Sequence, residues 1–224
     1  MQLEITVPES LNEITLEQYQ KYLKIQTEAL NEGDINQKTE EFLMVKLIEV
    51  FCNVRGDIVL KMRPSDIISI NNILTDMLNT NPSHIMKFKM NGKQYGFIPN
   101  LEDISFGEYI DLDTFLSDWD NMHKAMAVLY RPIKQKLGDK YLIEDYDAGD
   151  GEHMKQMPLD AVLGSIVFFY DLGIALSKAT LNSMEEEQEN SLVQYLNSEA
   201  SGVGISQYTH SLKEMLDGLK ISLN

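Results

Sequence analysis

The chain contains the stretch ITLEQY at residues 14–19 and a second version of it, ISFGEY, at residues 104–109. Each stretch follows a proline, Pro8 or Pro99, and each has a Thr or Ser three positions before a Gln or Glu, which is the spacing of a helix capping box. The flanking Ile and Tyr have the spacing of a hydrophobic staple. The two stretches therefore predict one α-helix over residues 15–31 and another over residues 106–117.

Apolar residues recur with helical spacing in six further segments. These are residues 37–52, 64–79, 122–129, 158–182, 192–196 and 212–219. Pro64 suits the first turn of its helix, and Asp118 or Asp120 can cap the helix over residues 122–129. The segment 158–182 is apolar most of the way round, so we expect it to be buried between other helices or against another chain. Gly164 and Gly173 within it indicate close helix packing, because glycine weakens a helix.

Three segments have the alternating pattern or the turn residues of β-structure. Residues 2–7 alternate apolar and polar side chains, which predicts an N-terminal strand. Residues 84–98 alternate on both sides of Asn91-Gly92, which predicts a central β-hairpin. Residues 133–147 carry lysines first and carboxylates after a Leu-Gly-Asp turn. This charged arm is either a hairpin paired with itself or an arm that reaches a neighbouring subunit.

These elements predict a mainly α-helical fold with a minor β component, arranged as a helical bundle with the N-terminal strand, the central hairpin and the charged arm. We expect three parts, at residues 1–80, 81–157 and 158–224, or one continuous domain. The first two parts share the order strand, proline, helix, helix, which suggests an internal duplication.

The charge balance of the 224 residues excludes several classes of function. The chain has 35 acidic and 19 basic residues and a net charge of -16, which repels phosphate backbones and anionic membrane surfaces. We therefore expect no direct, sequence-specific nucleic-acid binding and no membrane contact. No positively charged segment followed by an apolar stretch opens the sequence, so we expect no secretion by that route, and no apolar stretch reaches the roughly 20 residues that span a membrane. Its single cysteine, Cys52, excludes an internal disulfide.

The sequence predicts no catalytic, cofactor-binding or metal-binding residue. The acidic segment 145–153 fails the calcium-loop pattern, because Gly149 and Asp150 stand where that loop needs an acidic residue and a glycine. Cys52 lies on an apolar helix face, so we expect a buried, inert thiol. A hydrolase that uses Cys52 or the loop 145–153 remains as an alternative.

In the two capping stretches and over residues 104–133 the chain resembles small, acidic, helix-rich assembly proteins of tailed bacteriophages. It is most similar in style to neck or ring proteins that join the portal to the tail, especially in crAss-like phages, and next to tail-assembly chaperones. The resemblance implies no cofactor and cyclic homo-oligomers in a virion assembled in the host cytoplasm. It also implies contacts with portal, neck or tail proteins.

From these observations we expect a non-enzymatic structural protein that acts through protein–protein contacts, most of all a neck or ring component. Because a closed ring needs complementary patches, we expect the charged arm and the apolar helix at 158–182 to contact other subunits. Trp119 is either a core residue or an interface anchor. The candidate interface residues are Lys134, Lys136, Lys140, Glu144, Asp145, Asp147, Trp119, Phe168 and Phe169.

Overall fold

The computed structural model describes residues 5–31, 36–80, 82–138, 140–149 and 151–186, with the backbone alone for residues 176–186. The helices expected at residues 192–196 and 212–219 lie outside the described residues. The described chain is mainly helical and has a four-stranded antiparallel sheet. The prediction of a mainly α fold with a minor β component is therefore confirmed.

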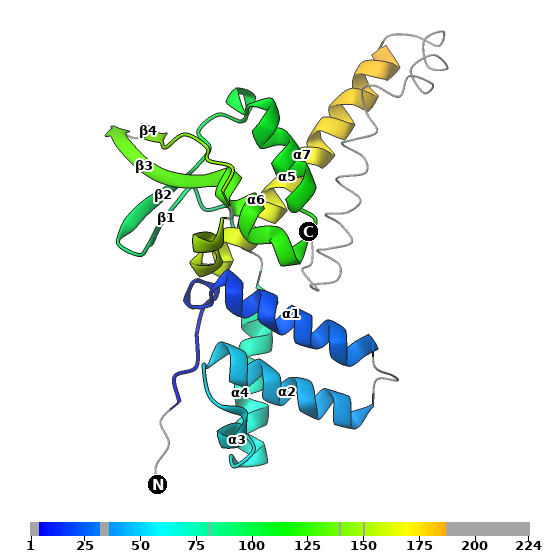
Figure 1. Cartoon of the computed structure of the whole chain (residues 1–224). Helices are drawn as coiled ribbons and strands as arrows, with labels where there is room; N and C mark the ends of the chain where they lie inside the picture. Colours follow the sequence, from blue (N-terminus) through cyan, green and yellow to red (C-terminus); the bar gives the residue numbers. More distant parts are fainter. Residues whose placement is uncertain (1–4, 32–35, 81, 139, 150, 187–224) are drawn as a thin grey trace.

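The N-terminal part of the structure is a group of helices (Figure 1). Its elements are the 3-10 turn η1 (Leu11–Glu13) and the helices α1 (Leu16–Asn31), α2 (Gln37–Phe51), α3 (Gly56–Val59) and α4 (Pro64–Leu78). Helices α1 and α2 lie side by side, and the side chain of Asn36 caps α2 by accepting hydrogen bonds from two backbone N–H groups. Pro64 occupies the first turn of α4, as expected.

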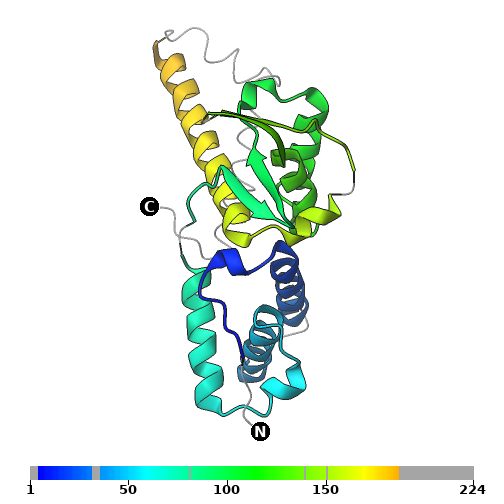
Figure 2. The same ribbon diagram turned by 90° about the vertical axis from the view of Figure 1, so that its left-hand side faces the viewer.

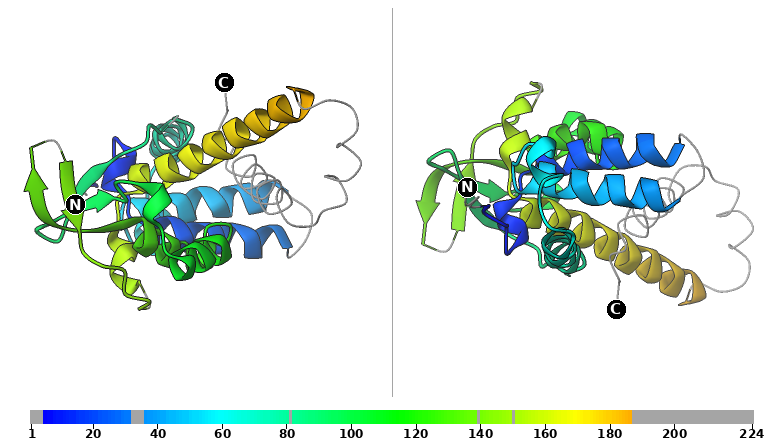
Figure 3. Two further views of the ribbon diagram at one scale, coloured as in Figure 1. Left: turned by 90° about the horizontal axis from the view of Figure 1, so that it is seen from above. Right: turned by 90° about the horizontal axis from the view of Figure 1, so that it is seen from below.

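The remaining elements form a sheet and the helices that pack beside it (Figures 1 and 2). The strands are β1 (Lys87–Met90), β2 (Lys93–Phe97), β3 (Tyr130–Leu137) and β4 (Lys140–Ile143), and they pair in that order. The other elements are η2 (Leu101–Asp103), α5 (Phe106–Phe115), η3 (Trp119–Asn121), α6 (Met122–Leu129), η4 (Glu152–Gln156) and α7 (Leu159–Glu186). Figure 3 shows the strands at one end of the molecule and the helices extending away from them.

Both predicted capping boxes are present. The backbone N–H of Thr15 donates to Gln18 Oε1 at 3.0 Å, and the backbone N–H of Gln18 donates to Thr15 Oγ1 at 3.3 Å. Ser105 and Glu108 make the same two hydrogen bonds at 2.8 and 3.3 Å. In each copy a 3-10 turn, η1 or η2, precedes the capped helix. The repeated sequence thus encodes the same local structure twice.

Both predicted hairpins form, and the sheet joins them. Asn91 and Gly92 have φ values of 50° and 75°, as a two-residue type I′ turn requires. Strand β2 pairs with β3 in the register Tyr95↔Pro132 and Phe97↔Tyr130. The central hairpin and the charged arm are therefore parts of one sheet, which the sequence did not indicate.

The N-terminal strand predicted over residues 2–7 is wrong for its described residues, 5–7, which have no strand partner. Ile5 and Val7 instead pack against the core. A strand needs another strand to pair with. The edges of the described sheet are β1 and β4, and neither of them pairs with residues 5–7. The order strand, proline, helix, helix is consequently absent from the described residues of the first half. What the two halves share in the structure is the 3-10 turn and the capped helix after it.

Helix α7 lies at the centre of the core. Its residues 161–166 are all buried, and Phe168 and Phe169 pack against Phe97 of β2. At the same level the hydroxyl of Tyr130 donates to the carbonyl oxygen of Ile85 at 2.6 Å and lies 2.8 Å from Ser165 Oγ. The expectation of a buried apolar helix is confirmed for residues 161–166, which pack against other parts of the same chain.

Candidate functional site

The charged arm is paired with itself. Strands β3 and β4 pair from Ile133↔Ile143 to Leu137↔Lys140, and Gly138 takes the positive φ of 64° that its turn needs. One of the expected charge pairs forms across the arm, with Lys134 Nζ 3.3 Å from Asp145 Oδ1. Both groups are largely exposed, so this ion pair stabilises the arm by no more than about 1 kcal/mol.

The sheet is rich in basic residues, although the chain as a whole is acidic. Residues 84–98 and 130–143, which form its two hairpins, hold seven of the 19 basic residues and one acidic residue, Asp139. The seven are Lys87, Lys89, Lys93, Arg131, Lys134, Lys136 and Lys140. The two hairpins are thus net positive on a chain that is net negative. An uneven distribution of charge of this kind gives different parts of a molecule different potentials.

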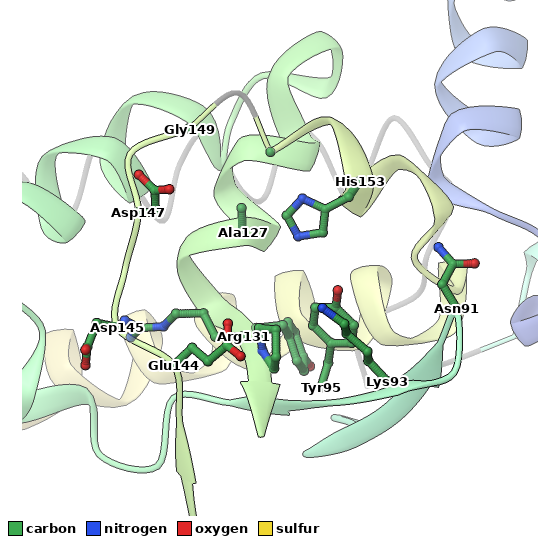
Figure 4. Close-up of a pocket in the computed structure, with 13 residues that line it drawn as sticks. Asn91, Lys93, Tyr95, Ala127, Arg131, Glu144, Asp145, Asp147, Gly149 and His153 are labelled. Carbon is green, nitrogen blue, oxygen red and sulfur yellow. The ribbon is translucent and has the colours of Figure 1, made fainter. Parts of the chain in front are cut away.

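A pocket of about 510 Å³ lies where the sheet meets the segment that follows β4. Three of the candidate interface residues, Glu144, Asp145 and Asp147, line it. Figure 4 shows Asp145 and Asp147 on the side opposite Lys93 and His153. The pocket therefore has acidic and basic walls. It also has the rings of Tyr95 and Tyr130 in its lining, which is a chemistry suited to a peptide segment with charged and apolar side chains.

A largely buried ion pair joins α5 to β3 beside this pocket. Arg131 Nη2 lies 2.8 Å from Glu108 Oε1, and the two side chains are only 13% and 8% exposed. Burial alone would raise the pKa of Glu108. The hydrogen bonds with Ser105 and the charge of Arg131 outweigh it, and they hold this pKa below its usual value. The pair fastens the start of α5 to β3.

Sequence reasoning missed this pair. It assigned Glu108 to the capping box and Arg131 to the end of a helix. A usable signal was present, because Glu108 replaces the neutral Gln18 of the first capping box and Arg131 stands among apolar residues. An arginine in an apolar strand needs a carboxylate partner from elsewhere in the fold.

The aromatic candidate residues lie apart from the arm. Trp119 packs edge-on against Tyr19 with ring centroids 5.1 Å apart, and its carbonyl oxygen accepts a hydrogen bond from Gln20 at 2.6 Å. Phe168 stacks on His84 at 4.4 Å, and Phe169 is buried. All three side chains contact the core of their own chain, so they present little surface beside the arm.

The described residues offer no metal centre, since none of them form a group of three His, Cys, Asp or Glu side chains that could hold an ion. Residues 145–149 run along the pocket, and Gly151 starts the turn η4 with a φ of 65°.

Among the helices that the structure describes, none combines the length and the apolar character that a membrane span requires.

We expect the thiol of Cys52 to react with a soluble aromatic disulfide far more slowly in the folded protein than in denaturant. Cys52 is buried, and burial raises the pKa of its thiol to about 11, so almost no thiolate exists near neutral pH. The release of coloured thiolate, followed by absorbance, measures the rate. Fast reaction of the folded protein would contradict the inert assignment and favour the hydrolase alternative.

Comparison of the chain with protein-family models, with curated proteins and with solved structures finds no match.

Proposed function

We propose that this chain is a non-enzymatic structural or assembly protein of a tailed bacteriophage, acting as a neck or ring component between portal and tail. The phage context comes from the resemblance of the capping stretches and of residues 104–133 to such proteins. The observation that carries the mode of action is the sorting of charge, with a basic sheet on a chain of net charge -16. Surfaces of opposite sign on one subunit favour ordered contacts with other subunits.

The buried environment of Cys52 supports the non-enzymatic assignment. A nucleophilic thiol needs a lowered pKa and a base nearby, whereas burial raises the pKa of Cys52. The pocket beside the arm contains ionisable side chains on both walls, but it contains neither a cysteine nor a serine. Its composition suits the recognition of another protein.

The experiment is a measurement of molar mass in solution by light scattering, at low and at high salt, with and without the portal protein encoded in the same genome. We expect a closed oligomer, or a stable complex with the portal protein, and a loss of mass at high salt. A monomer or dimer that binds another phage protein only transiently would indicate the tail-assembly chaperone instead. A monomer that is indifferent to the portal protein would overturn the neck assignment.

A further inference from the structure

The tip of the β3–β4 hairpin exposes apolar side chains between lysines. Leu137 and Leu142 are 55% and 49% exposed. The strand register puts them on the same face as Lys140, whereas Tyr141 packs over Gly96 on the opposite face, which Lys136 shares, so the two lysines flank the tip on both faces. Lysines on an edge strand are a common protection against edge-to-edge aggregation. That role explains the lysines, but it does not explain two exposed leucines among them.

Helix α5 exposes a second apolar surface, and acidic residues precede and follow it in the chain. Phe106, Tyr109 and Ile110 are 78%, 53% and 46% exposed. Positions i, i+3 and i+4 share one face of a helix, so these three side chains form a continuous patch. Asp113 extends the same face by one turn, and Glu102 lies in the 3-10 turn that leads into the helix. We refer to these five residues as the α5 surface.

The hairpin tip and the α5 surface complement each other in charge and in apolar character. Two tips would repel each other through their lysines, and two α5 surfaces would repel each other through their carboxylates. Within one chain the tip points away from the helices, and α5 lies on the other side of the sheet-bearing part in Figure 1. Each surface can therefore meet its complement on a second copy of the chain.

We infer that the hairpin tip of one copy binds the α5 surface of the next, in a head-to-tail contact. This contact joins two different patches, so it is heterologous, and a heterologous contact closes into a ring when its rotation allows. The inference rests on the proposed function and adds to it the two surfaces that touch. It assigns to the charged arm the role of reaching a neighbouring subunit while it remains paired with itself.

Two charge-reversal variants test this contact. The tip variant carries Lys136→Glu and Lys140→Glu, and the helix variant carries Glu102→Lys and Asp113→Lys. All four side chains are exposed, so the fold should persist, and circular dichroism and thermal melting check that it does. The matched controls, Lys24→Glu with Lys38→Glu and Glu28→Lys with Asp76→Lys, reverse the same number of charges on exposed positions of α1, α2 and α4.

The decisive measurement is the mass of each variant alone and of an equimolar mixture, by sedimentation at low salt. We expect the wild type and both controls to assemble, and each variant alone to remain a monomer of about 25.6 kDa. The mixture should regain species larger than a dimer, because both kinds of contact within it join surfaces of opposite charge. The intact tip of the helix variant binds the intact α5 surface of the tip variant, and the Glu-bearing tip of the tip variant binds the Lys-bearing α5 surface of the helix variant.

Three results would overturn the inference, namely variants that assemble like the wild type, a mixture that stays monomeric while the wild type assembles, or a wild type that never self-associates. The first two leave the proposed neck function standing, because the wild type still forms an oligomer through another surface. A wild type that neither self-associates nor binds the portal protein refutes both.

Discussion

Glu108→Gln should lower the free energy of unfolding by about 3–5 kcal/mol, the cost of removing one partner from a buried ion pair. Glutamine keeps an acceptor for the capping hydrogen bond from Ser105, as Gln18 does in the first capping box. It removes the carboxylate that lies 2.8 Å from Arg131 Nη2, so the largely buried guanidinium loses this ion pair. Urea unfolding at neutral pH measures the loss.

The control for this prediction is Asp66→Asn. Arg63 Nε and Asp66 Oδ2 lie 3.0 Å apart, close to the spacing of the buried pair, but both side chains are well exposed. Their ion pair should contribute no more than about 1 kcal/mol. Equal losses in the two variants would mean that Glu108 and Arg131 do not form a desolvated pair.

The stabilisation by Glu108 should also depend on pH. Because the pKa of Glu108 is lower in the folded protein than in the unfolded chain, its contribution is present above the usual pKa of a glutamate side chain. It is lost as the pH falls through the lower, folded-state pKa. The gap in stability between wild type and Glu108→Gln should therefore narrow in acid, and urea unfolding over a pH series measures it. A gap that stays constant would show that protonation of Glu108 is not coupled to unfolding.

The sequence predicted the local elements because their signals lie within a few residues. A capping box needs positions 15 and 18, or 105 and 108, and the type I′ turn needs only Asn91 and Gly92. Each is decided by hydrogen bonds between near neighbours in the chain. The same reasoning placed the turn at Gly138 and the start of the helix at Pro64.

The sheet as a whole could not be predicted in this way. Strand β2 pairs with β3 across more than thirty residues of intervening chain, and nothing in either segment specifies the other. Residues 5–7 illustrate the opposite error, because they alternate like a strand but have no neighbouring edge to pair with. An alternating pattern indicates that one side of a segment is buried, but it does not indicate whether a strand partner exists.

The candidate site was predicted only where its signals lie close together in the sequence. Charge segregation along residues 133–147 identified the arm, because both of its strands are local. The partner of Arg131, the lining of the pocket by Tyr95 and His153, and the exposed face of α5 all depend on how distant elements pack. Helix α5 shows the limit clearly, since its apolar Tyr109 and Ile110 are exposed while its charged Glu108 is buried.

Gly164→Ala should destabilise the protein by about 1–3 kcal/mol, although alanine favours a helix by about 1 kcal/mol over glycine. A Cβ atom at this position of α7 would overlap the carbonyl oxygen of Ser83 and lie 3.3 Å from the Cα atom of His84. Both obstacles are backbone atoms of the segment between α4 and β1, so they cannot move aside as a flexible side chain does. Gly164 thus permits a close approach as expected, but the neighbour is the irregular segment that contains Ser83 and His84 and not another helix.

Gly107→Ala provides the matched control, because Gly107 lies in helix α5 and a Cβ atom there would meet nothing within 4 Å. This variant should gain about 1 kcal/mol from helix propensity alone. Thermal and urea unfolding of both variants should therefore give changes of opposite sign. If Gly164→Ala instead gained stability as Gly107→Ala does, α7 would not pass so close to Ser83. The joint between the N-terminal helices and the sheet would then be looser than the structure has it.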